Sequence, residues 1–199
     1  MSATSAPFGF RPSFHNSGQI RPKAYTIAST YAANIFMGDP VKLIDDGTIQ
    51  LATSDGSRTG TVDGVLCLGI LAGVEYTDAQ GKPTVSNFWP TGTTATNIVA
   101  YVFDDPETLF DVQYANPGTP GTTTVQTAVG EECDWTPTAA GGSTSTGLSS
   151  TSLTVIQATS GQFQITGFHL FPNDSLTDAY LTATVRINEH QYKAAVNSI

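Results

Sequence analysis

Short apolar runs separated by turn sequences, at intervals of roughly 8–15 residues, constrain this chain more than any other feature. Residues 181–187 alternate between apolar and polar side chains, and residues 97–103 are almost wholly apolar. Asp46-Gly47 between two such runs is typical of a tight turn that joins antiparallel strands. This pattern predicts an all-β fold whose body is an antiparallel β-barrel or β-sandwich.

The composition supports the same fold class. The chain has 30 Thr, 16 Ser, 19 Gly and 11 Pro, which together exceed a third of its 199 residues and are poor helix formers. An all-helical fold is therefore excluded. Hydrophobic residues make up 39% of the chain, including 10 Phe, which is enough for one large domain with its own core.

The strand pattern favours residues 65–76 as a central buried strand with a bend at Gly69 or Gly73. One short helix is expected at 173–180, where Ser175 and Asp178 have the spacing of a capping box. The other expected strands are 24–28, 34–40, 41–44, 48–52, 84–89, 97–103, 109–114, 153–156, 162–165, 168–171 and 181–187.

Three parts of the chain differ in character. Residues 1–23 are expected to form an extended N-terminal arm, and residues 24–114 plus 153–199 the β body. Residues 115–152 are expected to form a surface lobe or insertion, because Gly/Ser/Thr/Pro-rich stretches cannot bury a core.

The N-terminal residues are basic and aromatic in an acidic protein. Residues 1–38 have no Asp or Glu and a charge of +3, whereas the whole chain has −9, so the remainder has −12. Aromatic residues and Arg are enriched at the buried centres of protein interfaces. This favours an arm that lies across a partner, with an ordinary N-terminal loop as the alternative. The predicted partner-binding residues are Phe8, Phe10, Arg11, Phe14, Arg21 and Lys23.

Several classes of function are not favoured. The net charge argues against a nucleic-acid binder, since phosphate neutralisation needs clustered Lys and Arg. No apolar run approaches the roughly 20 residues that span a bilayer, and the N-terminus lacks the pattern of a signal peptide. We therefore expect no membrane partner and no export. Cys67 and Cys133 are expected to be reduced, with Cys67 a small buried hydrophobe.

No catalytic motif stands out. His15, His169 and His190 are scattered and lack the paired spacing of zinc ligands. No nucleophile elbow, P-loop or dinucleotide fingerprint occurs. A Ser–His–Asp triad stays open, because such triads assemble from distant parts of a chain. The sequence thus predicts no catalytic residue, no cofactor and no metal site.

Two acidic loops, 104–111 and 131–134, have alternative interpretations. The favoured one is a turn with solvated charges, since Asp104-Asp105-Pro106 directly follows a strand. Carboxylates of this density can also hold Ca²⁺, or act as the acid and base of a glycosidase.

Read in order, several segments resemble a family of small virion proteins of tailed bacteriophages, which are capsid decoration (cement) or related structural proteins. The resemblance covers most of the chain except 115–152. Its carriers are Phe8-Gly-Phe-Arg-Pro12, Ile20-Arg-Pro22, Tyr25-Thr-Ile-Ala28, Ile35-Phe-Met-Gly-Asp-Pro-Val41, Asp46-Gly-Thr-Ile49, 69–76, Ser86-Asn-Phe-Trp-Pro90, Ala100-Tyr-Val-Phe-Asp-Asp-Pro106, Phe110-Asp-Val-Gln113 and Val185-Arg-Ile-Asn-Glu-His-Gln191.

The resemblance implies a non-enzymatic protein that is made in the cytoplasm of a host cell and lies on the outer capsid surface of a virion. Such proteins clamp neighbouring major capsid protein subunits and associate with copies of themselves, with a homotrimer favoured over a homodimer. A tail, fibre or other surface carbohydrate-binding module is the alternative, in which Trp89, Trp135 and the exposed acids would line a sugar or Ca²⁺ site. A β-fold hydrolase is a third hypothesis.

Overall fold

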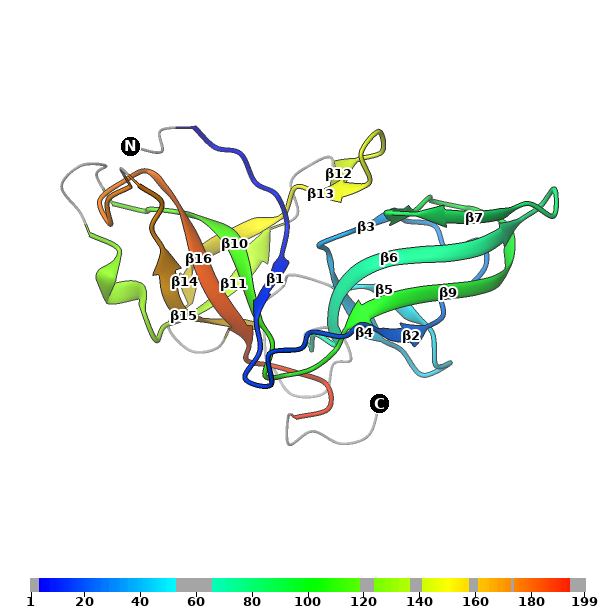
Figure 1. The fold of residues 1–199 in the computed structure, drawn as a ribbon, viewed down its shortest axis with the longest axis horizontal. Helices are drawn as coiled ribbons and strands as arrows, with labels where there is room; N and C mark the ends of the chain where they lie inside the picture. Colours follow the sequence, from blue (N-terminus) through cyan, green and yellow to red (C-terminus); the bar gives the residue numbers. More distant parts are fainter. Residues whose placement is uncertain are drawn as a thin grey trace.

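The computed structural model describes residues 4–52, 66–118, 124–136, 141–172 except 158–160, and 174–193. Within these ranges the fold is all-β, and the single helical turn is the 3₁₀ segment η1, Gln126–Ala128. The predicted all-β class is therefore confirmed. The strands form two β units that lie beside each other along the long axis of the molecule (Figure 1).

The first unit is a closed five-stranded barrel, on the left in Figure 1. Pairing between its first and last strands closes the ring, and β1 (Arg11–Phe14) extends it by pairing with the first strand. Around the ring, the strands are β10 (Leu109–Ala115), β14 (Ser152–Gln157), β11 (Glu132–Thr136), β15 (Phe163–His169) and β16 (Tyr180–Ile187).

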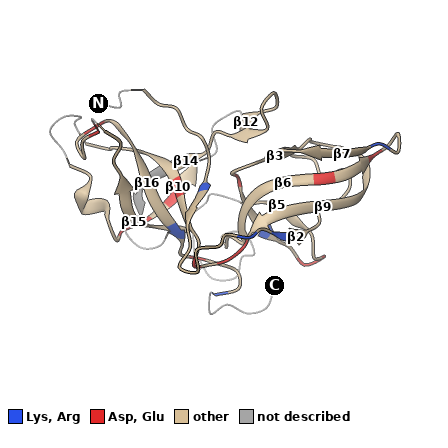
Figure 2. Ribbon diagram, viewed as in Figure 1, with Lys and Arg blue, Asp and Glu red and all other residues tan. Residues whose placement is uncertain are grey.

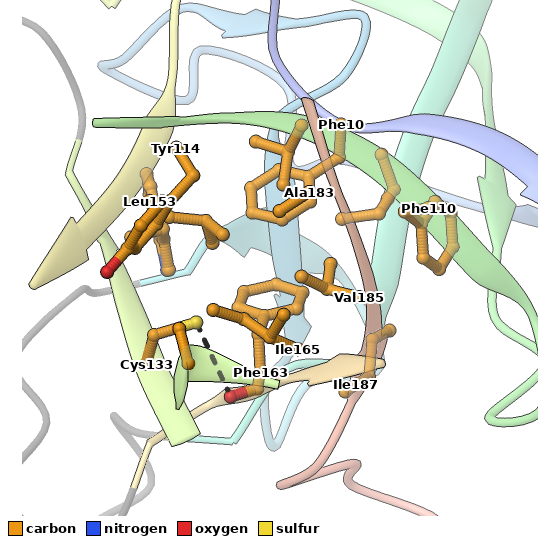
Figure 3. Close-up of a cluster of buried hydrophobic side chains, with 14 of the residues drawn as sticks. Phe10, Phe110, Tyr114, Cys133, Leu153, Phe163, Ile165, Ala183, Val185 and Ile187 are labelled. Carbon is orange, nitrogen blue, oxygen red and sulfur yellow. Dashed lines mark hydrogen bonds between the residues drawn. The ribbon is translucent and has the colours of Figure 1, made fainter. Parts of the chain in front are cut away.

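The interior of the barrel is filled by alternate side chains of these strands (Figure 3). In β16, Leu181, Ala183, Val185 and Ile187 are buried while the residues between them are not, as the pleat of a strand requires. The alternation in the sequence therefore predicted this face correctly. Phe10 enters the same core, where its ring stacks on Phe163 with 4.4 Å between centroids.

The second unit is a six-stranded sheet, on the right in Figure 1, with its own buried cluster around Ile35, Val41 and Trp89. Two short pairs accompany the sheets: β3 (Ile35–Phe36) with β8 (Phe88–Trp89), and β12 (Gly142–Ser143) with β13 (Leu148–Ser149). The strands of the sheet are β2 (Lys23–Tyr25), β9 (Ala95–Phe103), β6 (Gly69–Asp78), β4 (Pro40–Leu43) and β5 (Ile49–Leu51), with β7 (Pro83–Ser86) paired to the outer half of β6.

The predicted central strand is β6, and its two glycines have different roles. The register of β6 against β9 shifts between Leu71 and Gly73, which is the expected irregularity. Gly69 instead allows close packing, because a Cβ there would lie 2.3 Å from the carbonyl oxygen of Phe103. Gly69 is therefore required by the approach of β9 and not by a bend.

The chain path differs from the expected division into arm, body and lobe. The sheet unit, β2 to β9, is inserted between β1 and β10, so the barrel combines an N-terminal strand with the second half of the chain. Within the expected arm 1–23, β1 is extended, residues 16–18 form a turn, and residues 1–3 lie outside the described residues. However, Phe10 is only 1% exposed, so the structure places this predicted partner-binding residue in the core of the chain. The reason is that β1 pairs with β10 and carries the Phe10 ring into the barrel core.

The expected surface lobe 115–152 also contains part of the core. Val125, Cys133 and Trp135 are buried, and Trp135 donates a hydrogen bond from Nε1 to Oε1 of Gln162 at 2.6 Å. The low-complexity flanks concealed a five-residue barrel strand, β11. The hairpin of β12 and β13 does lie at the surface, with residues 143–146 exposed.

The helix expected at 173–180 is a turn in its described part. The capping-box contact exists, since the Ser175 amide donates to Asp178 Oδ2 at 3.0 Å. No helix follows, because the chain enters β16 at Tyr180 and exchanges backbone bonds with β10 and β15 instead.

Candidate functional site

Three distant segments meet at the lower edge of the molecule in Figure 1. They are residues 14–25, the turn 104–108 between β9 and β10, and the C-terminal residues 188–193, and we call them together the three-segment surface. Figure 2 shows that charges of both signs gather there. This edge contains three of the predicted partner-binding residues, Phe14, Arg21 and Lys23.

The C-terminal segment is held in place by hydrogen bonds to the sheet unit. The amide of Cys67 donates to the carbonyl of Glu189 and the amide of Gln191 donates to the carbonyl of Cys67, both at 3.0 Å. The Gln191 side chain continues this pattern on β4, since Oε1 accepts from the Leu43 amide at 2.7 Å and Nε2 donates to the Leu43 carbonyl at 2.9 Å. Gln191 thus occupies the position of an additional strand residue beside β4.

We expect Gln191→Ala to lower the free energy of unfolding by about 1–3 kcal/mol, because it leaves a partly buried amide and carbonyl of Leu43 without these bonds. Chemical denaturation measures the change. Lys193→Ala is the matched control, since its exposed ion pair with Glu107 contributes little in water. Equal stability of the Gln191 variant and the wild type would contradict the bracing role.

His190 joins this segment to the charged turn. Its side chain is buried, Nδ1 accepts the amide hydrogen of Tyr192 at 3.1 Å, and Nε2 lies 2.9 Å from the carbonyl oxygen of Asp104. The ring therefore carries its hydrogen on Nε2 and donates it to Asp104. Burial lowers the pKa of His190, which keeps the ring neutral at physiological pH.

A second cluster surrounds Asp104. The Tyr25 hydroxyl donates to Asp104 Oδ2 at 2.6 Å and lies 3.2 Å from the Tyr192 hydroxyl. Lys23 Nζ lies 3.6 Å from the same carboxylate, and 5.4 and 5.5 Å from the ring centroids of Tyr25 and Tyr192. Burial and the bond to Asp104 raise the pKa of Tyr25 above its ordinary value, so its hydroxyl stays a donor. Residues 23–25 are thereby tied to the Asp104 carboxylate, and Tyr192 of the C-terminal segment joins them through Tyr25.

His15 lies between Ser17 and Asp105, which are the residue types of a catalytic triad. Nδ1 is 2.7 Å from Ser17 Oγ, and Nε2 is 3.2 Å from Asp105 Oδ2. However, Nδ1 also accepts the backbone amide hydrogen of Ser17 at 3.1 Å, so its lone pair is shared with a turn bond. Ser17 is exposed and also bonds with the backbone of Gln19. We interpret these contacts as bonds that shape the 15–19 turn.

Several acids in each loop have partners within the chain. Asp104, Asp105 and Glu107 contact Lys23, His15 and Lys193 respectively, and the Lys193 contact lowers the pKa of Glu107. Glu132 and Asp134 accept the backbone amides of Gly161 and Gln162. These contacts favour the structural interpretation of the loops. Among the described residues, no group of three or more His, Cys, Asp or Glu side chains is arranged to hold a metal ion.

The other predicted residues are distributed as follows. Phe14 is 54% exposed, and Arg21 is exposed with Nη2 on the Gln19 side-chain oxygen at 2.6 Å. The Arg11 guanidinium lies 4.6 Å from the centroid of Phe8, so these two residues form a stacked pair. Tyr192, which is 53% exposed, is not among the predicted residues, because it follows the last strand in a stretch without periodicity.

The comparisons with known proteins give no family for the chain. No protein-family model, curated protein or solved structure matches it. In the described residues, no helix has the length and apolar character needed to cross a membrane. Both cysteines are buried free thiols, and burial raises the pKa of each to about 12.

Proposed function

We propose that this protein is a non-enzymatic virion structural protein that decorates the outer capsid surface and bridges neighbouring major capsid protein subunits, as a homotrimer. The observation that carries the proposal is the exposure of two aromatic side chains, Phe14 and Tyr192, on either side of the charged turn 104–108. Arg21 and Lys23 complete this surface. Aromatic and Arg side chains of this kind anchor protein interfaces.

The bracing of the surface supports a binding role. His15 and Lys23 fix residues 14–25, and His190 fixes residues 188–193, to the turn 104–108 before any partner arrives. A pre-organised surface loses less conformational entropy on binding, so more of the contact energy appears as affinity.

The position of the surface supports bridging. It lies where the barrel and the sheet unit meet, at the middle of an elongated molecule (Figure 1). A molecule seated by its middle extends one β unit over each side of a boundary between two capsid subunits.

The two Trp side chains that the carbohydrate-binding alternative requires are buried. Trp89 is fully buried and packs edge-on against Tyr76, and Trp135 is 1% exposed inside the barrel. Neither indole can stack on a sugar, which requires an exposed ring face. The burial of both indoles therefore argues against a sugar site lined by these two residues.

Binding to capsid particles that lack the protein tests the proposal. We expect Phe14→Ala and Arg21→Ala each to weaken binding by about ten-fold or more, since loss of an interface anchor costs roughly 1–2 kcal/mol. Their melting temperatures should match that of the wild type, because both side chains are exposed.

Val85→Ala is the matched control, because Val85 is 83% exposed on β7, far from the three-segment surface. It should bind as the wild type does. If Phe14→Ala and Arg21→Ala also bind unchanged, the surface is not the contact. If the wild-type protein fails to bind any capsid and binds glycans, the capsid proposal is overturned in favour of the alternative.

A further inference from the structure

A buried carboxylate, Asp39, lies where residues 4–14 pass between the two β units. We call residues 4–14 the N-terminal segment. Its side chain is 2% exposed. Oδ2 accepts the amide hydrogen of Phe36 at 2.8 Å, and Oδ1 accepts the hydroxyl hydrogen of Ser149 at 2.5 Å. The carboxylate therefore joins the turn before β4 to the strand β13.

Ser149 also packs against the N-terminal segment. A Cβ at Gly9 would lie 2.6 Å from Ser149 Cβ, so the segment passes in direct contact with this serine. The Gly9 amide donates to the carbonyl of Thr151 at 3.1 Å, and the Thr151 amide donates to Ser149 Oγ at 3.1 Å. The next residue, Phe10, donates its amide hydrogen to Gly38, adjacent to Asp39, at 2.9 Å.

The surroundings of the Asp39 carboxylate are uncharged in the described structure. The N-terminal segment contributes Gly9 and Phe10, β3 contributes Phe36, β6 contributes Leu71 and β13 contributes Ser149. None of these side chains titrates, and no neighbouring charge perturbs Asp39. An ionised carboxylate here loses its hydration without a cation to compensate.

We propose that the burial of Asp39 beside Ser149 acts as a proton-dependent clasp for the N-terminal segment, closed more firmly when Asp39 is protonated. Opening of residues 4–14 would uncover Ser149 and Asp39 and return the carboxyl group to water. The opened state then binds a proton less tightly than the closed state. Segment opening is accordingly linked to pH even if the rest of the fold stays intact.

The direction of this pH dependence follows from the pKa of Asp39 in the closed state. Burial raises the pKa of Asp39 to about 6, and the bonds from Ser149 and Phe36 only partly oppose this. An exposed Asp has a pKa of about 3.9. The stabilisation by the bound proton is complete below about pH 4 and is lost as the pH rises through about 6.

Hydrogen exchange of the full-length protein at pH 5 and pH 7 tests the clasp. After correction for intrinsic exchange rates, we expect the opening equilibrium of residues 9 and 10 to rise about ten-fold from pH 5 to pH 7. The opening equilibrium of β9, an inner strand of the sheet unit, should not change comparably, so β9 serves as the internal reference. Equal protection of residues 9 and 10 at both pH values would overturn the proposal.

Two variants separate the clasp from general pH effects. In Asp39→Asn the pH dependence of residues 9 and 10 should disappear, because the amide does not titrate. In Ser149→Ala the transition should move to higher pH, because the hydroxyl bond that lowers the pKa of Asp39 is lost. Persistence of the pH dependence in Asp39→Asn, or an unmoved transition in Ser149→Ala, would overturn the proposal.

Discussion

Phe10→Ala is expected to lower the free energy of unfolding by about 3–5 kcal/mol, as large-to-small changes of buried aromatic residues do. The Phe10 ring is 1% exposed and stacks on Phe163, so its removal leaves a cavity in the barrel core. The backbone bond from Phe10 to Gly38 keeps the segment in place and limits collapse of that cavity. Urea denaturation followed by Trp fluorescence measures the change.

Phe14→Ala provides the comparison, because Phe14 belongs to the same N-terminal segment but is 54% exposed. We expect its free energy of unfolding to stay within about 0.5 kcal/mol of the wild type. Similar losses of the free energy of unfolding in the two variants would contradict the placement of Phe10 in the core and Phe14 at the surface. A stable Phe10→Ala protein would return Phe10 to the partner-binding residues.

Trp135→Ala is expected to lower the free energy of unfolding by about 3–5 kcal/mol. Trp135 is 1% exposed on β11 and donates a hydrogen bond to Gln162 at 2.6 Å. Its loss opens a void where β11 meets β14 and removes that bond. Thermal and chemical denaturation both measure the effect.

Thr136→Ala is the control on the same strand, because Thr136 is exposed. We expect little change in its stability. The pair of variants tests whether residues 132–136 belong to the barrel or to a surface lobe. A Trp135→Ala protein as stable as Thr136→Ala would support the lobe that the composition suggested.

Local sequence patterns correctly predicted the elements that are stabilised by contacts between residues close together in the chain. Alternation in residues 181–187 predicted the inward face of β16, and the Asp46 turn is closed by its side chain, which accepts the Thr48 amide at 2.8 Å. Asp78 forms the same kind of contact at the tip of the hairpin between β6 and β7, where its side chain accepts the amides of Gln80 and Lys82. These contacts span only a few residues, so the sequence contains them.

Local patterns failed where two outcomes share the same local contacts. The capping-box bond of Ser175 and Asp178 is compatible with a helix and with a turn. Pairing of β16 with β10 and β15 decided for the turn. In residues 131–136 the acids suggested exposure, but Glu132 and Asp134 accept the backbone amide hydrogens of residues 161 and 162, directly before the neighbouring strand β15.

The sequence by itself determined the all-β class, the hairpin turns and the buried positions of the regular strands, because alternation and turn chemistry act over a few residues. Only the tertiary structure decided which residues of the N-terminal segment are buried. Phe10 and Phe14 lie four residues apart in the same basic, aromatic stretch, yet Phe10 is buried in the barrel and Phe14 faces solvent. The difference arises from the pairing of β1 with β10, which joins residues about 100 positions apart. The three-segment surface has the same origin, since its parts meet only when the barrel and the sheet unit are both complete.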